Sequence, residues 1–118
     1  MKLQFIEYPA CSTCKRAKKY LQQHQMDMDV RHIVEDTPSV EELRTWYKRS
    51  NLELKKFFNT SGNVYKDLKL KDKLPSMSEE EQLQLLSSNG MLIKRPIVVS
   101  DDKILVGFQE ENYEKLCS

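Results

Sequence analysis

The chain has 118 residues, and its 19 lysines and arginines against 18 aspartates and glutamates give a formal net charge of +1. This length is most simply one domain, residues 1–118, with one modest core. The balanced charge gives no reason to expect nucleic acid or a membrane surface as a partner. Apolar runs are only a few residues long and the amino terminus reads directly as a strand, which predicts a cytoplasmic protein.

The first predicted elements are a strand and a helix that meet at two cysteines. The strand is indicated by the apolar residues Leu3, Phe5, Ile6 and Tyr8. The helix is indicated by apolar residues at helical spacing, Cys14, Ala17 and Leu21. This junction places Cys11 at the helix N-cap, where unpaired amides and the helix dipole stabilise an anion. We therefore expect Cys11 to be the nucleophilic thiolate and Cys14, one turn later, to close a disulfide.

Several roles remain open for this Cys-x-x-Cys pair. Four basic residues follow it closely and favour low-pKa thiols over inert buried cysteines: Lys15, Arg16, Lys18 and Lys19. A structural zinc site would need two more ligands at metal spacing, and Cys117, His24 and His32 are scattered along the chain. A structural disulfide would close too small a loop to restrict the unfolded chain much. Redox chemistry is the interpretation that we favour, with Cys117 as a plain helix-end residue.

A second strand and a βαβ unit are predicted next. The first helix is expected to end near residues 24–25, and alternating apolar residues predict a strand from Met28 to Val34. A strand, a helix and a strand in about thirty residues imply parallel strands and a right-handed crossover.

Residues 39–89 are predicted to be mostly helical. A helix capped by Ser39 or Thr37 comes first. Its core-facing stripe consists of Val40, Leu43, Trp46 and Tyr47. A short helix over residues 52–58 and a turn-rich segment over residues 59–63 follow, and the segment borders the active site or is a plain surface turn.

Two further helices complete this region. The first covers residues 64–70 and is broken by residues 71–75. The second begins at Ser76 or Ser78, with glutamates in its first turn, and is expected to use Asn89-Gly90 as its C-cap. Its inward residues are Leu83, Leu85 and Leu86. Beyond it, two β-branched runs over residues 96–99 and 104–107 predict an antiparallel hairpin. A closing helix is predicted from Gln109 to Leu116.

The element order βαβ, helices, ββα resembles the thioredoxin/glutaredoxin fold, an α/β mixed sheet, with a helical insertion at about residues 39–89. Three segments resemble the arsenate reductase (ArsC)/Spx family more closely, namely residues 8–15, 94–99 and 106–108. The resemblance covers essentially the whole chain. This family comprises glutaredoxin-coupled arsenate reductases, Spx-type regulators that bind RNA polymerase, and many members of undefined activity.

The resemblance assigns roles to individual residues. Cys11 falls on the catalytic or first redox cysteine of both groups, whereas Cys14 matches only the Spx group. Arg95 matches an arginine common to both. The two other arginines that hold the oxyanion in the reductases are replaced by Asn59 and Gly107. Because an oxyanion site with one guanidinium of three loses most of its charge-assisted hydrogen bonds, we do not expect efficient arsenate reduction.

The resemblance also implies a cis peptide bond between Arg95 and Pro96, with Pro96 opposite the cysteine pair. A trans proline that opens a strand is the alternative. Arg95 is then expected to act on the Cys11 thiolate or on a bound anion, the alternative being a surface arginine paired with Glu110 or Glu111.

These observations predict a thiol–disulfide oxidoreductase of the undefined ArsC-like branch. Its catalytic residues are Cys11, Cys14 and Arg95, and its supporting residues are Pro96, Ser12 and Thr13. We expect no cofactor or metal, and a thiol reductant such as glutathione/glutaredoxin or thioredoxin as co-substrate. An Spx-like redox-sensing regulator that binds RNA polymerase is the alternative, although the chain ends soon after Leu116, without the longer tail usual for those regulators.

Overall fold

The computed structural model describes residues 2–118 and divides the chain into two compact units. The sheet unit comprises the residues up to His32 together with Arg95–Ser118, and the helical unit comprises Ile33–Lys94. The single domain expected over the whole chain stays a prediction. No helix within residues 2–118 is long and apolar enough to cross a membrane.

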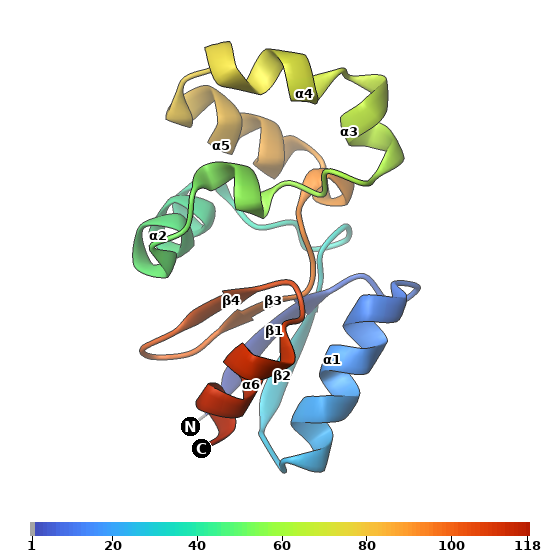
Figure 1. The fold of residues 1–118 in the computed structure, drawn as a ribbon, viewed down its shortest axis with the longest axis vertical. Helices are drawn as coiled ribbons and strands as arrows, with labels where there is room; N and C mark the ends of the chain where they lie inside the picture. The colour runs from blue at the N-terminus through green and yellow to red at the C-terminus, as the bar shows by residue number, and fades with distance from the viewer. Residues whose placement is uncertain (1) are drawn as a thin grey trace. The chain divides into compact units, whose positions relative to one another are not determined.

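The sheet unit is built on a four-stranded mixed sheet in the order β2-β1-β3-β4 (Figure 1). Its strands are β1 (Leu3–Glu7), β2 (Met28–His32), β3 (Ile97–Val99) and β4 (Ile104–Val106). Strand β1 is parallel to β2 and antiparallel to β3, and β4 is antiparallel to β3. The predicted βαβ unit and the predicted hairpin are both confirmed.

Two helices pack against this sheet, α1 (Ser12–Gln23) and α6 (Glu110–Cys117) (Figure 1). Their shared core consists of Leu3, Phe5, Ala17, Leu21, Val98 and Tyr113. Side chains two residues apart on β1 and four apart on α1 lie on one side of their element, so a strand and a helix meet through their apolar sides. This arrangement confirms the predicted thioredoxin-like fold class.

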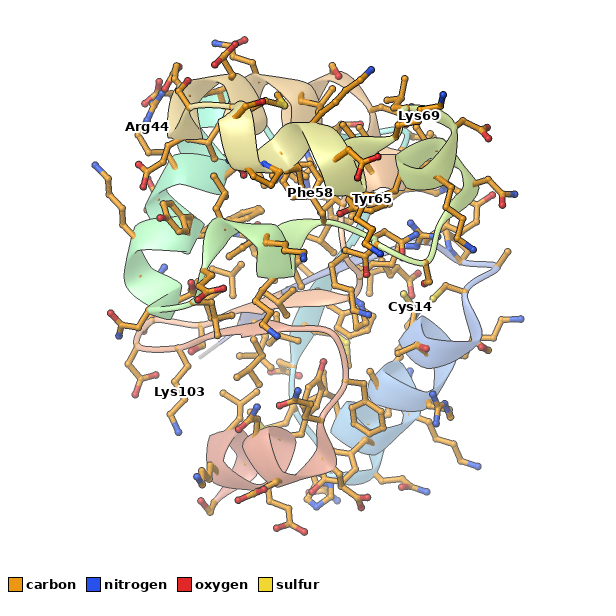
Figure 2. The ribbon with its side chains drawn as sticks, turned by 45° about the horizontal axis from the view of Figure 1, so that its top comes forward. Cys14, Arg44, Phe58, Tyr65, Lys69 and Lys103 are labelled. Atoms are coloured by element: carbon orange, nitrogen blue, oxygen red, sulfur yellow. The ribbon has the colours of Figure 1, made fainter. Side chains whose placement is uncertain are left out.

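The helical unit confirms the predicted insertion. Its helices are α2 (Val40–Ser50), α3 (Asn63–Asp67), α4 (Leu70–Lys73) and α5 (Glu79–Ser88). Three short 3-10 helices join them, at Leu54–Phe57, Leu74–Ser76 and Gly90–Leu92. Helices α2 and α5 begin with capping boxes in which Ser39 and Ser78 bond reciprocally with glutamates three residues later. Phe58 and Tyr65, labelled in Figure 2, meet at a tilted angle with ring centroids 6.3 Å apart.

Three predicted boundaries are wrong. Strand β2 ends at His32, and Val34 lies exposed in a turn. The helix expected over residues 64–70 ends at Asp67, because Lys69 adopts a left-handed backbone with φ 55°. The break expected at residues 71–75 is itself helical as far as Lys73, and only Pro75 with its neighbours changes the backbone to a 3-10 turn.

The predicted helix end at Asn89-Gly90 is confirmed, with Asn89 as the C-cap, but the cap does not have the left-handed backbone usual at such an end. Asn89 is extended, with φ −157°, and Gly90 opens a 3-10 turn instead of closing α5 in a left-handed conformation. Gly90 is required by a close approach, because a Cβ atom there would lie 2.1 Å from the carbonyl oxygen of Ile33. Gly90 therefore indicates the end of α5 correctly. The reason for a glycine there is the close approach of the Ile33 backbone, and not a left-handed helix cap.

Candidate functional site

Cys11 is the N-cap of α1, as predicted. Its backbone is extended, with φ −79° and ψ 122°, and its Sγ accepts a hydrogen bond from the backbone amide of Cys14 at 3.5 Å. The Cys11 amide in turn donates to the carbonyl oxygen of Tyr8 at 2.9 Å, which closes the turn after β1. Figure 2 labels Cys14 at this end of the helix. The Cys11 sulfur thus lies where the unpaired amides of α1 favour an anion.

The electrostatics of this site favour the Cys11 thiolate. Partial burial raises the pKa of Cys11, but hydrogen bonds from the amide and the thiol of Cys14 and from the Thr13 amide lower it. The positive charge of Arg95 lowers it further, and the resulting pKa lies below that of an ordinary thiol. Because its pKa is lowered, Cys11 carries more thiolate than an ordinary cysteine at the same pH.

Cys14 has the opposite character. Its side chain is fully buried, and this burial raises the pKa of Cys14 to about 12. The hydrogen bond and the charge of Cys11 raise it as well, whereas the Tyr8 amide and the charge of Arg95 act to lower it. Both cysteines are free thiols, as is Cys117 at the end of α6. Of the two thiols in the motif, only Cys11 is suited to attack first.

This difference predicts a selective alkylation profile. Iodoacetamide reacts with thiolates, so the Cys11 rate should rise with pH through an inflection below that of a free cysteine. Cys14 should stay nearly unreactive until the pH approaches 12. Mass spectrometry of the labelled peptide, with each cysteine counted separately, measures both profiles. Faster labelling of Cys14, or two profiles like that of free cysteine, would contradict the assignment.

The basic residues of α1 do not account for the lowered pKa, although they suggested it from the sequence. Lys18 forms an ion pair with Glu7 at 3.6 Å, and the Arg16 guanidinium donates to the Thr13 hydroxyl at 3.5 Å. Their charges are engaged along the helix and at β1. The cationic contribution to the Cys11 pKa comes from Arg95, more than eighty residues away in sequence.

Arg95 reaches the site through the pairing of β3 with β1. These strands are antiparallel, with Ile6 opposite Ile97, so the start of β3 lies beside the end of β1, from which the chain continues to Cys11. The Arg95–Pro96 peptide bond is cis, as the resemblance implied. The Arg95 Cζ atom lies 5.3 Å from the centroid of the Tyr8 ring.

The two positions expected to lack arginines differ in their surroundings. Gly107 has φ 80°, its amide donates to the Pro96 carbonyl at 2.8 Å, and its carbonyl accepts from the Tyr113 hydroxyl at 3.0 Å. An arginine at 107 would therefore have to adopt a left-handed backbone in a turn held from both sides. Asn59 belongs to the helical unit, where its amide donates to the Leu92 carbonyl at 2.7 Å.

Tyr8 is the site residue that the sequence analysis missed. Its apolar ring was interpreted as part of the strand, but it lies after the end of β1 and is only half-buried. Its position between a strand and Pro9, three residues before Cys11, is the signal that could have identified it. Ser12, predicted to support the site, opens α1 and is exposed.

No group of three or more histidine, cysteine or acidic side chains within residues 2–118 is arranged to hold a metal ion.

Comparisons with known proteins find relatives over nearly the whole chain. The model of the ArsC family matches residues 6–116. The chain is 53% identical to the uncharacterized protein YusI of Bacillus subtilis, over 98% of each chain, and 31% identical to the regulatory protein MgsR of that organism, over 97% of this chain and 89% of MgsR. The global transcriptional regulator Spx of Enterococcus faecalis is 27% identical, over 91% of this chain and 80% of Spx.

Among solved structures, an ArsC family related protein from Bacteroides fragilis has 57% sequence identity and a TM-score of 0.95, with 98% of each chain covered. The family model and these relatives cover nearly the whole chain, and the chain therefore belongs to the ArsC family.

Proposed function

We propose that this protein is a cytoplasmic thiol–disulfide oxidoreductase in which Cys11 is the nucleophile and Cys14 the resolving thiol. The observation that carries the proposal is the contrast between two thiols one helical turn apart. Cys11 is partly exposed with a lowered pKa, and Cys14 is buried with a raised one. A contrast of this kind separates the roles of attacking and resolving thiol.

The first step is attack of the Cys11 thiolate on one sulfur of a substrate disulfide. A bond forms between Cys11 Sγ and that sulfur, the substrate S–S bond breaks, and the other substrate sulfur leaves as a thiolate that takes a proton from water. In the second step the Cys14 sulfur attacks Cys11 Sγ, which releases the second substrate thiolate. The substrate gains two electrons, and the protein is left with a Cys11–Cys14 disulfide.

Capping of Cys11 changes the electrostatics of Cys14. Two of the influences that raise the Cys14 pKa are the hydrogen bond and the negative charge of Cys11, and a mixed disulfide removes that charge. The charge of Arg95 remains and lowers the Cys14 pKa. Burial, the largest cause of the raised Cys14 pKa, remains, but the Cys14 thiol is more easily deprotonated once Cys11 has reacted, and its proton can pass to the leaving substrate thiolate.

Turnover requires a thiol reductant that opens the Cys11–Cys14 disulfide. We propose the thioredoxin system or glutathione with glutaredoxin for this role. Both donate two electrons by thiol exchange, so this protein would need no cofactor of its own. Efficient arsenate reduction is not part of the proposal. Arg95 is the one guanidinium retained of the three that the family resemblance associates with the oxyanion, and the Gly107 backbone leaves little freedom for another.

A redox-sensing regulator is the second candidate, because MgsR and Spx are regulators by name and the chain matches most of their length. In this case oxidation of the same cysteine pair would control binding to RNA polymerase, the partner implied by the family resemblance. Multiple turnover of a disulfide substrate with a thioredoxin or glutaredoxin system supports the oxidoreductase. Co-purification with RNA polymerase without such turnover supports the regulator.

Replacing Arg95 by alanine tests the site electrostatics. Arg95→Ala should raise the Cys11 pKa and slow its reaction with disulfides, because a positive charge that favours the thiolate is lost. The thermal unfolding midpoint should change little, because a half-exposed cation–π contact contributes about 0.5–1 kcal/mol.

Arg16→Ala is the matched control, since it removes a guanidinium from α1 that does not lower the Cys11 pKa. It should leave the alkylation profile of Cys11 unchanged. A variant Arg95→Ala that unfolds more easily but keeps its thiol reactivity would show that Arg95 is a structural residue.

A further inference from the structure

The geometry points to Tyr8 as a positioning residue, whose ring holds the Arg95 guanidinium beside the cysteine pair. The inference rests on the proposed function, because it concerns the group that acts on the Cys11 thiolate. Tyr8 would act through Arg95, and its ring would contact neither the substrate nor the reacting sulfur.

The first observation is the contact between the ring and the cation. The Arg95 Cζ atom lies 5.3 Å from the Tyr8 ring centroid, within the roughly 6 Å over which the face of an aromatic ring attracts a guanidinium. Both side chains are half-buried, so water screens their attraction less than it would on an open surface. The contact with the ring therefore restricts the rotamers that the long Arg95 side chain can adopt.

The second observation is that the Tyr8 backbone contacts both cysteines. Its carbonyl oxygen accepts the Cys11 amide at 2.9 Å, and its amide donates to the Cys14 sulfur. One residue therefore binds Arg95 with its ring and the two thiol residues with its peptide groups. If the guanidinium moves away from the thiols while the Tyr8 backbone stays in place, its contact with the ring is lost, so Tyr8 helps to set the separation between the charge and the thiolate.

The third observation is that the ring itself is held. The edge of His32 meets the Tyr8 ring with centroids 5.8 Å apart and an interplanar angle of 86°, a favourable geometry for aromatic side chains. His32 is the last residue of β2 and pairs with Glu7, the residue before Tyr8. The parallel pairing of β1 with β2 thus fixes the ring on which Arg95 rests.

The test is a double-mutant cycle on the Cys11 pKa, in the full-length chain with Cys117→Ser. The variants are Tyr8→Leu, which removes the aromatic face, Tyr8→Phe, which keeps the face and removes only the hydroxyl, Arg95→Ala, and the double variant Tyr8→Leu/Arg95→Ala. The pKa is read from the pH dependence of iodoacetamide labelling of the Cys11 peptide, and circular dichroism with thermal melting checks that each variant folds.

We expect Tyr8→Leu to raise the Cys11 pKa by at most as much as Arg95→Ala does, because the variant leaves the Arg95 charge in place and removes only the contact that positions it. Tyr8→Phe should behave like the wild type. In the Arg95→Ala background, Tyr8→Leu should have no further effect, because there is no cation left to position.

Three results would overturn the inference. The first is that Tyr8→Leu raises the Cys11 pKa equally in the presence and in the absence of Arg95. The second is that Tyr8→Phe raises the Cys11 pKa as much as Tyr8→Leu does. The third is that Tyr8→Leu keeps the wild-type Cys11 pKa although Arg95→Ala raises it. Each of these leaves the thiol–disulfide function in place. Failure of the proposed function is a different result, namely a wild-type Cys11 that titrates like free cysteine and forms no disulfide with Cys14.

Discussion

Replacing Cys14 by serine should turn the protein from a catalyst into a covalent trap. In the proposed reaction Cys14 releases the substrate from Cys11, so a serine there stops the reaction at the mixed disulfide. Multiple turnover should fall to the background rate. Affinity-purified Cys14→Ser from cells should carry its substrates on Cys11, and non-reducing gels followed by reduction and mass spectrometry identify them. The same experiment names the physiological substrate.

Two variants control this experiment. Cys11→Ser removes the nucleophile and should trap nothing, because the Cys14 side chain is fully buried and this burial, which keeps its thiol protonated and out of reach of substrates, remains in the variant. Cys117→Ser removes the third cysteine, at the end of α6, and should behave like the wild type. The mechanism is wrong if the Cys14→Ser variant keeps multiple turnover, or if covalent adducts form on Cys117 instead of Cys11.

The elements around the cysteine pair could be predicted because their signals are local. Strand β1 and helix α1 follow from apolar periodicities, and a cysteine at the junction of the two falls at the N-cap by spacing alone. The capping boxes at Ser39 and Ser78 belong to the same class of signal, in which a serine and a glutamate three residues apart define a helix start.

The positive charge that contributes to the lowered Cys11 pKa could not be predicted from local signals. Nearby sequence suggested Lys15 to Lys19, but a helix spreads consecutive side chains around its axis and only some of them face its N-terminus. The charge that counts, Arg95, arrives through the pairing of β1 with β3, which is a long-range contact. The proposed role of Tyr8 depends on the same pairing, whereas local sequence indicates its ring only as an apolar member of the first strand.

Helix ends in the helical unit show a further limit. The lysine-rich segment before Pro75 was expected to break a helix, yet its residues are helical, as part of α4, as far as Lys73. Lysine and aspartate are acceptable within a helix, and the proline constrains only its own neighbourhood. Gly90 likewise indicates the end of a helix from sequence. The contact that excludes a side chain there is made by the Ile33 carbonyl oxygen, more than fifty residues earlier.

Replacing Gly90 by alanine should strongly destabilise the protein. The added Cβ would lie 2.1 Å from the carbonyl oxygen and 2.8 Å from the carbonyl carbon of Ile33, and 3.0 Å from the Cα atom of Val34. All three atoms belong to the backbone, so relief requires the chain after β2 to move away from the 3-10 turn. Overpacking typically costs 1–3 kcal/mol and occasionally more, and we expect about 3 kcal/mol here, a fall of roughly 10 °C in the thermal midpoint.

Gly62→Ala is the matched control, because it makes the same chemical change in the same unit. Its Cβ would lie 2.6 Å from the Asn59 Nδ2 atom, but this atom is the end of a half-buried side chain that can rotate away. The Gly62 backbone has an ordinary φ of −81°. Since alanine also reduces the freedom of the unfolded chain, the net change should stay within about 1 kcal/mol. Urea denaturation of both variants measures the difference. Equal stabilities for Gly90→Ala and Gly62→Ala would mean that the segment at Ile33 yields easily, and that the close approach at Gly90 does not hold the helical unit together.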